Sequence, residues 1–253
     1  RELYFIQELA EFINNPANNT LLITAVHQNF DAYSFGLNAA QRQEWAKVKG
    51  RFKEVTFNEP IEQLLFLAAE SLSSKQIQDI KIKRLIDLEL SLFESSKAFN
   101  LNQDYAKQIA NKLVPLELFS ANVLTLTLQK YGQNERSLFT FLESPELVNK
   151  IRNGEVFSVS DCFDYLISNL SSEIEDGEKN PFKAQWKAAI VAIEKAEFLF
   201  ESNYNVSSQI LKTICLVNIF SNQGGKLDRE FIESYCKNIL SIDEPLQILD
   251  VLV

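Results

Sequence analysis

Gly50, Arg51 and Phe52 form the segment of this sequence whose residue types and spacing come nearest to a known kind of chemistry. A guanidinium is planar and permanently protonated, so a positioned arginine can stabilise the charge on a phosphoryl group during its transfer. The alternative is an ion pair with Glu54, Glu59 or another surface carboxylate, a contact worth about 0–1 kcal/mol. The residue types alone leave both interpretations of Arg51 open.

Three polar residues, His27, Gln28 and Asn29, follow the apolar run TLLITAV at 20–26. That run has the length of a strand and no polar alternation, which predicts a strand covered on both faces. Open α/β sheets bind their ligands beyond the carboxyl ends of their strands, so the three side chains are candidates for ligand contacts. They could equally solvate an ordinary loop, and a lone histidine is more often a hydrogen-bonded loop residue than a catalyst.

The elements that would position these residues are mostly helices. Apolar residues at helical spacing run through 1–13, and a polar helix is expected over 37–48 before a short strand at 54–57. Pro60 opens the next helix, because proline is tolerated in a first turn. Further helices are expected at 81–99, 104–113, 118–131, 135–144, 160–174, 183–200, 207–220, 228–240 and 244–253, with a turn-rich stretch from 145 to Gly154.

This order of elements predicts a mainly α fold with a short α/β part at its N-terminal end. Residues 1–59 hold the predicted strands, 60–172 form a helical domain, and the acidic stretch 173–181 is a candidate linker. Residues 181–253 form a second helical domain. The short helices around its Gly-Gly turn at 224–225 are compatible with a helix-turn-helix or winged-helix element that binds DNA, and equally with an ordinary helical bundle.

Composition narrows the class of protein. With 253 residues and 46% apolar content the chain can bury a substantial core, and a net charge of −9 with a pI near 4.9 argues against a surface that binds nucleic acid throughout. Three widely spaced cysteines and one histidine support neither a disulfide framework nor a metal site. The cysteine pattern favours a reducing, cytoplasmic setting. The apolar runs are too short to span a bilayer, so we expect no membrane partner.

The segment GRFKEVTFNEPIEQLLFL at 50–67, in this order of elements, resembles the second half of an AAA+ ATPase core and its helical lid. In that superfamily a strand ending in polar residues carries the first sensor, which implies a nucleotide-binding position for His27, Gln28 and Asn29. The resemblance also implies that Arg51 is an arginine finger offered to a neighbouring subunit.

A second match is YGQNERSLFTFLE at 131–143, which is similar to the lid helix that carries the second sensor of many AAA+ proteins. Arg136 would be that sensor and would contact the nucleotide. The alternative is an ordinary charge on a helix surface. Together with HQNFDAY and EWAKVKGRF, the segment GQNERSLFTFL also resembles large bacterial P-loop ATPases, some of them linked to phage defence.

The sequence departs from that superfamily in one large respect. No Gly-x-x-x-x-Gly-Lys-Ser/Thr loop occurs in these 253 residues, and no apolar strand ends in Asp-Glu to hold Mg²⁺. The chain begins at Arg1 and contains no methionine, so we expect the carboxyl-terminal part of a longer ATPase whose missing half precedes Arg1. ATP and Mg²⁺ would be cofactors of the full-length protein, and this chain alone would bind neither and be inactive.

Two functions from different classes therefore stay open. The first is part of an AAA+-like ATP-binding and hydrolysing protein, whose partners are the missing N-terminal half and further copies of itself. The second is a helical protein-interaction module with no nucleotide chemistry, which binds a partner protein or closes an oligomer. An independent hydrolase finds no support, because there is one histidine and no nucleophile elbow.

Overall fold

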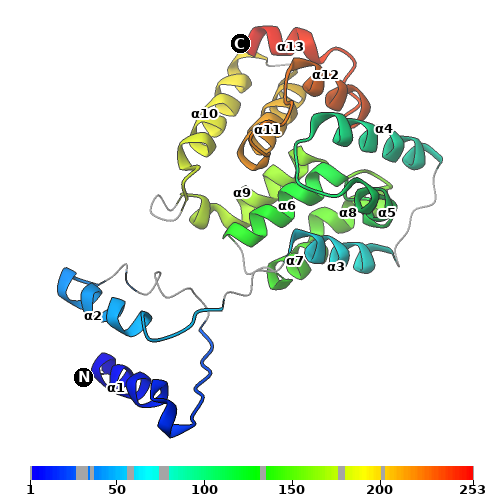
Figure 1. The fold of residues 1–253 in the computed structure, drawn as a ribbon. Helices are drawn as coiled ribbons and strands as arrows, with labels where there is room; N and C mark the ends of the chain where they lie inside the picture. The colour runs from blue at the N-terminus through cyan, green and yellow to red at the C-terminus, as the bar shows by residue number, and fades with distance from the viewer. Residues whose placement is uncertain are drawn as a thin grey trace. The chain divides into compact units, whose positions relative to one another are not determined.

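The computed structural model describes residues 2–26, 34, 37–55, 60–73, 80–131, 135–175, 180–200 and 203–252. These residues form thirteen α-helices and one short 3-10 helix, and no β-strand occurs among them (Figure 1). The mainly α fold expected from the sequence is confirmed. The chain divides into two units, residues 1–58 and 59–253, and each is described here by itself.

Unit 1 holds a helical pair and an irregular segment. Its elements are α1 (Glu2–Asn14), η1 (Pro16–Asn18) and α2 (Ala39–Lys49), and α1 packs against α2. Asn38 begins α2 with a reciprocal capping box, in which its side chain accepts from the Gln41 N–H and the Gln41 side chain accepts from the Asn38 N–H. Among the described side chains of unit 1, Ala10 and Val48 are the only buried apolar ones.

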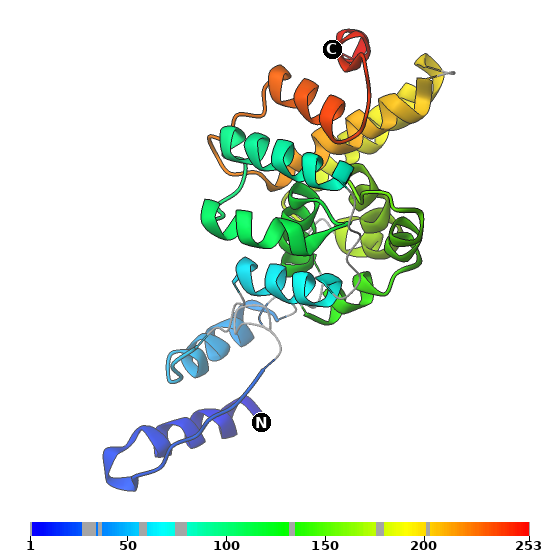
Figure 2. The same ribbon diagram turned by 90° about the vertical axis from the view of Figure 1, so that its right-hand side faces the viewer.

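The strand predicted at 20–26 is not a strand in the structure. Figure 2 shows these residues as a drawn-out segment after η1, without regular secondary structure. Leu21 is 81% exposed, Ile23 82% and Val26 53%. The described residues contain no second strand, and a lone strand would leave its backbone N–H and C=O groups unpaired. The second predicted strand, 54–57, is irregular at 54–55, and its remaining residues lie outside the described part.

Unit 2 is a helical array around one central helix, α6 (Leu118–Tyr131). Ten residues of α6 are buried, and α3, α4, α5, α9 and α11 contact it. Polar side chains on α6 are hydrogen-bonded: the Asn122 Nδ2 donates to the Leu118 carbonyl at 2.7 Å, and the Thr127 Oγ1 donates to the Val123 carbonyl at 2.7 Å. The Ser120 Oγ also donates to the Phe157 carbonyl at 2.8 Å. Because these groups have partners, α6 can be surrounded by apolar side chains.

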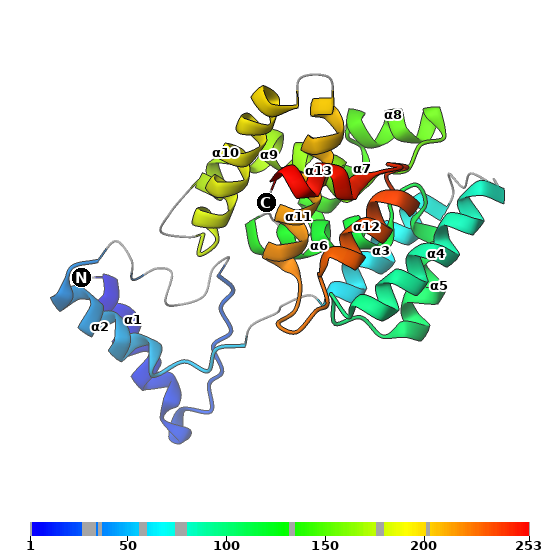
Figure 3. The same ribbon diagram turned by 90° about the horizontal axis from the view of Figure 1, so that it is seen from above.

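Helix α7 also contacts α6, and α8, α10, α12 and α13 pack on the helices around it (Figures 1 to 3). α10 and α11 lie side by side and contact each other along their lengths (Figure 3). One hydrophobic core runs from Leu64 to Leu249 and so includes both predicted helical domains. The helices are α3 (Ile61–Ser73), α4 (Ile80–Ser96), α5 (Gln103–Leu113), α7 (Glu135–Leu142), α8 (Pro145–Asn153), α9 (Val159–Glu175), α10 (Lys183–Leu199), α11 (Tyr204–Phe220), α12 (Arg229–Asn238) and α13 (Pro245–Leu252).

Helix α8 corrects the prediction of a turn-rich stretch from 145 to 154. The Ser144 side chain accepts from the Leu147 N–H at its N-terminus, Pro145 occupies the first turn, and Gly154 ends the helix with φ 65°. All three are ordinary helix boundary signals. Proline and glycine also occur in turns, but here they stand at opposite ends of a helix.

The connection between α11 and α12 is bonded to the connection between α4 and α5. The Asn222 N–H donates to the Ala98 carbonyl at 2.8 Å, and the Lys226 N–H donates to the Ser96 carbonyl at 2.7 Å. A Cβ added to Gly225 would lie 3.2 Å from the Ala98 Cα, so a side chain there would require the neighbouring backbone to move by a few tenths of an ångström. Residues 203–252 contain no strand, so the winged form of the C-terminal region is not seen.

Candidate functional site

Arg51 lies just beyond the end of α2 and links it to α1. Its Nη1 donates to the Lys47 carbonyl at 2.7 Å, its Nη2 donates to the Glu11 Oε1 at 2.5 Å, and its own carbonyl accepts from the Asn14 Nδ2 at 2.9 Å. The pKa of Glu11 is lowered, first by the hydrogen bond from Gln7 and then by Arg51. The guanidinium is thus held against a surface carboxylate, which the sequence left open as the alternative to a phosphate.

Arg136 is the second residue of α7 and is exposed. Its carbonyl accepts from the Thr140 Oγ1 at 2.9 Å, while Leu138, Phe141 and Leu142 from the same helix are buried. Arg136 therefore lies on the outward side of an amphipathic helix, where it can reach a ligand without disturbing the core. Arg136 belongs to unit 2 and Arg51 belongs to unit 1.

The other predicted site residues, His27, Gln28 and Asn29, lie outside the described residues. The run that precedes them carries exposed apolar side chains, and α1 carries exposed aromatic ones. Tyr4 is 64% exposed, Phe5 63% and Phe12 57%. Phe5 and Phe12 are seven residues apart and so share one face of α1. Large apolar side chains of unit 1 are thus exposed on both α1 and the run at 20–26.

Two buried carboxylates form a site that the sequence reasoning missed. The Glu89 Oε1 on α4 accepts hydrogen bonds from the backbone N–H groups of Leu118 and Phe119, the latter at 3.3 Å, and so caps the N-terminus of α6. The Glu117 Oε1 accepts from the Val159 N–H at 2.9 Å and so caps α9. Glu89 and Glu117 are each 3% exposed.

Burial controls the protonation of this pair. It raises the pKa of Glu89 to about 8, although the two backbone N–H groups oppose the shift. Burial, and then the nearby charge of Glu89, raises the pKa of Glu117 well above its ordinary value. The Glu117 Oε2 has no hydrogen-bond partner among the described residues, which fits a protonated oxygen better than a charged one. Neither group reaches solvent, so the pair has a structural role.

A signal for Glu89 was present in the sequence. Ile86, Glu89 and Phe93 stand at i, i+3 and i+7, so Glu89 lies on the apolar stripe of α4, and all three side chains are buried. A charged residue on such a stripe is either paired or protonated. For Glu117, the residue before a central helix, no comparable pattern exists.

Metal and thiol chemistry find no site in the described part of the chain. No group of three or more His, Cys, Asp or Glu side chains there could hold a metal ion. Cys162, Cys215 and Cys236 are buried and form no disulfide. Burial raises the pKa of Cys215 and of Cys236 to about 12, so both thiols stay protonated at neutral pH and are poor nucleophiles. None of the described helices is long and apolar enough to cross a membrane.

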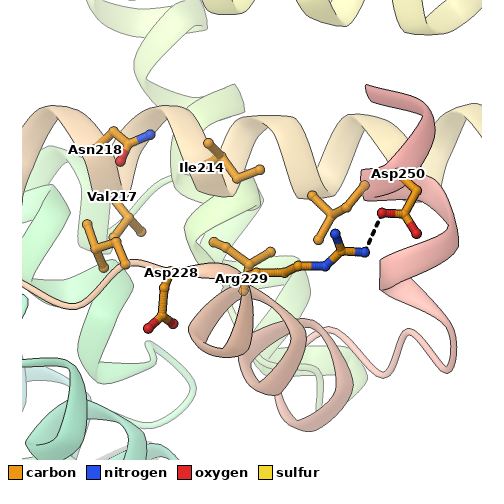
Figure 4. Close-up of a pocket in the computed structure, with 9 residues that line it drawn as sticks. Ile214, Val217, Asn218, Asp228, Arg229 and Asp250 are labelled. Atoms are coloured by element: carbon orange, nitrogen blue, oxygen red, sulfur yellow. Dashed lines mark hydrogen bonds and ion pairs between the residues drawn. The ribbon is translucent and has the colours of Figure 1, made fainter. Parts of the chain in front are cut away.

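An apolar groove with a volume of about 340 Å³ lies between α11, α12 and α13 (Figure 4). Its walls are apolar, and Asn218, Asp228 and the ion pair of Arg229 with Asp250 stand at its edges. Asp228 is also the N-cap of α12, because its Oδ1 accepts from the Phe231 N–H at 3.0 Å. We call this feature the C-terminal groove; its apolar lining is Ile214, Val217, Leu227, Ile232 and Leu249.

Comparison with protein-family models, with curated proteins and with solved structures finds no match for the chain. Function must therefore be argued from the chain's own residues.

Proposed function

We propose that this chain is the carboxyl-terminal part of an AAA+-like protein that binds and hydrolyses ATP. In this proposal unit 1 completes the α/β core, Arg51 is the arginine finger, and the helices from α3 onward form the lid and a C-terminal helical region. The proposal rests on one observation, the exposed apolar run at 20–26.

That run has the composition of an interior strand of a parallel sheet. Leu21 and Ile23 would face one side of a sheet, and Leu22 and Thr24 the other, because side chains alternate along a strand. Strands apolar on both faces belong to sheets that helices cover on both sides. The apolar face of α1, with Phe5 and Phe12, is suited to cover one of those sides. A sheet supplied by another part of the same protein would satisfy both features.

The finger role of Arg51 is compatible with its contacts. The bonds to Glu11 and to the Lys47 carbonyl fix the guanidinium at the end of α2. A positioned guanidinium loses little entropy when it binds a phosphate, which is the requirement for a group that stabilises charge in phosphoryl transfer. Arg136, exposed on α7, is the proposed contact from the lid, and His27, Gln28 and Asn29 are proposed to follow the sensor strand. ATP and Mg²⁺ would bind the complete protein.

The test is ATP binding and steady-state ATP turnover by the complete product of the reading frame that encodes this chain. Arg51→Ala should lower kcat by about 10³-fold with little change in the Kd for ATP, since a finger acts mainly in the transition state. Lys53→Ala removes a nearby exposed cation and serves as the control, with turnover unchanged. Unchanged turnover in Arg51→Ala would remove the finger role, and a complete product that does not bind ATP would remove the proposal.

A second candidate function is a helical interaction module without nucleotide chemistry, and the C-terminal groove favours it. An apolar groove between helices is a common docking place for a partner helix. Nucleotide binding distinguishes the two functions. An interaction module would bind its partner protein, and the complete product of the reading frame would not bind ATP.

A further inference from the structure

We infer that α12 and α13 form a flap that closes over the buried pair Glu89 and Glu117, and that loss of a proton from the pair releases the flap. The flap comprises residues 228–252, and the ion pair of Arg229 with Asp250 joins its two helices (Figure 4). No residue of unit 1 takes part, so the inference is independent of the proposed ATPase function. The device would make the conformation of this end of unit 2 depend on pH.

Tyr235 connects the flap to the carboxyl pair. It is fully buried, and its hydroxyl donates to the Glu117 Oε1. Burial raises the pKa of Tyr235, and Glu117 and Glu89 raise it further, so Tyr235 lies near both carboxyl groups. Phe231, one turn earlier on α12, packs with Tyr235 on the Phe119 ring, at centroid distances of 5.6 and 5.7 Å. The flap therefore covers the pair with apolar rings and one hydroxyl group.

No cation in the described part of the chain balances a negative charge on the pair. Besides each other, the two carboxyl groups face three titratable groups of neighbouring helices, which are Asp161 and Cys162 on α9 and Tyr235 on α12. Among the described residues, no titratable group of α5 or α6 affects the pKa of either carboxyl group. Asp161 is itself paired with Lys150 at 3.2 Å. Two neighbouring buried carboxylates without a cation cannot both be ionised, so the closed flap requires a proton on the pair.

Two cavities border the flap. The C-terminal groove lies between the flap and α11, and a second cavity of about 210 Å³ lies between α4 and α12. Ser96 lines the second cavity from α4, seven residues after Glu89 and on the same side of the helix, and Phe231 lines it from α12. The rest of its lining includes the polar side chains of Ser95, Lys226, Glu230 and Ser234. Water can therefore occupy this cavity and hydrate the pair when α12 moves away from α4.

The pKa of Glu89 sets the direction of the pH effect. It is about 8 in the closed form, and 4.5 is the ordinary value to which it returns once the carboxyl group is hydrated. The closed form therefore holds a proton that the open form releases. The contribution to closure is fully present below pH 4.5 and is lost progressively up to about pH 8. The pKa of Glu117 is also raised, by burial and then by Glu89, and acts in the same direction.

Two cysteines report whether the flap opens. Cys236 lies on α12 and Cys215 on α11; both are buried, and Cys215 does not line the groove that faces the flap. Burial alone raises the pKa of each thiol to about 12, so the ratio of their rates of reaction with N-ethylmaleimide is insensitive to the titration of the thiols. Peptide mass spectrometry measures both rates on the chain as it stands. The ratio of Cys236 to Cys215 should rise about tenfold or more from about pH 6 to about pH 8.5.

Three variants connect the effect to the pair. Glu89→Gln cannot ionise, so its rise over the same pH range should be at least about threefold smaller than that of the parent chain. Glu94→Gln changes an exposed carboxylate of the same helix and is the matched control, with the full rise of the parent chain. Tyr235→Phe removes the hydrogen bond from the flap to Glu117, so it should raise the ratio at about pH 6 about fivefold or more.

The ratio in the parent chain decides the inference even if a variant does not fold. A ratio that stays constant with pH would overturn it, and if both rates rose together the pair would act on the whole of unit 2 and not on a flap. Equal rises in Glu89→Gln and the parent chain, or an unchanged ratio in Tyr235→Phe, would also overturn it.

Discussion

The Tyr235 hydroxyl donates a hydrogen bond to the Glu117 Oε1, and the two residues are 118 positions apart in the chain. Glu117 precedes the central helix α6, and Tyr235 lies on α12. The Val159 N–H at the start of α9 lies 3.1 Å from the same hydroxyl oxygen and 2.9 Å from the same carboxylate oxygen. One buried cluster of polar atoms therefore connects three helices that come from distant parts of the sequence.

Tyr235→Phe should lower the free energy of unfolding by about 1–3 kcal/mol, because it removes a donor from a buried carboxyl group that has few other partners. Tyr105→Phe is the matched control. The Tyr105 hydroxyl donates to the Glu62 carbonyl at 2.7 Å in a more exposed setting, so its loss should have a smaller effect. Urea denaturation followed by circular dichroism measures both variants. Equal losses in the two would contradict a special role for the buried cluster.

Stability should fall as the pH rises above about 4.5. Glu89 has a pKa of about 8 in the folded chain and an ordinary value of 4.5 when unfolded. The folded state therefore holds a proton that the unfolded state releases, so the contribution of this group is fully present below pH 4.5 and is lost progressively up to about pH 8. The loss is on the order of 2–5 kcal/mol.

Glu89→Gln separates this effect from other titrations. Glutamine keeps an acceptor oxygen for the N–H groups of Leu118 and Phe119 but cannot ionise. The variant should match the parent chain near pH 5 and should be the more stable of the two at pH 8.5, with denaturation midpoints as the readout. Parallel pH profiles for the two proteins would show that Glu89 is not the titrating group.

Glu11→Gln tests whether Arg51 acts on phosphate or only on its neighbour. If Arg51 is a finger, this change should leave ATP turnover of the complete reading-frame product within about threefold, because glutamine still accepts a hydrogen bond and the guanidinium keeps its charge. If Arg51 only holds α1 against α2, Glu11→Ala, which removes the acceptor, and Arg51→Ala should impair the protein alike. The comparison needs only the kcat of each variant.

Gly225→Ala should destabilise unit 2 by about 1–3 kcal/mol, because the added methyl group meets the backbone of the neighbouring loop, which cannot move aside as a side chain would. Lys226→Ala, which keeps the backbone N–H that bonds to Ser96, should have little effect. Thermal unfolding would reveal the difference. A neutral Gly225→Ala would mean that the two loops separate easily.

Ile23→Asp should leave the thermal unfolding of this chain unchanged, because the side chain is 82% exposed. In the complete product, where we propose that 20–26 becomes a sheet strand, the same change should abolish ATP turnover, since a charge would be buried. Asn19→Asp, just outside the run, is the control. Full turnover in Ile23→Asp would rule out an interior strand at this position.

Local patterns predicted most of the helices, because helices such as α5 and α12 bury one apolar face and expose a polar one. Helix α8 was missed although Ser144, Pro145 and Gly154 mark its ends, so that information was present and misinterpreted. The run at 20–26 was assigned from composition alone. A strand needs a neighbouring strand, and the described residues supply none.

The contacts of the site residues were harder to predict from the sequence than the positions of the helices. A partner for Arg51 among the surface carboxylates was anticipated, but Glu11 lies 40 residues away in the chain and only the packing of α1 on α2 brings it close. The contacts of Glu117 with Val159 and Tyr235 depend in the same way on tertiary structure. Periodicity shows which face of a helix is buried, and it does not show which helix covers that face.

The exposed run at 20–26 has a consequence for how the protein must be handled in the cell. LLITAV has high β-propensity and carries no charge, proline or glycine. Segments of this composition, when exposed, pair with identical segments of other chains and start cross-β aggregation. A newly made chain would need this segment covered, by its own sheet or by a chaperone, before copies accumulate. The capacity of the cell to keep this segment covered would then limit the abundance of the protein, rather than the free energy of unfolding of its helical core.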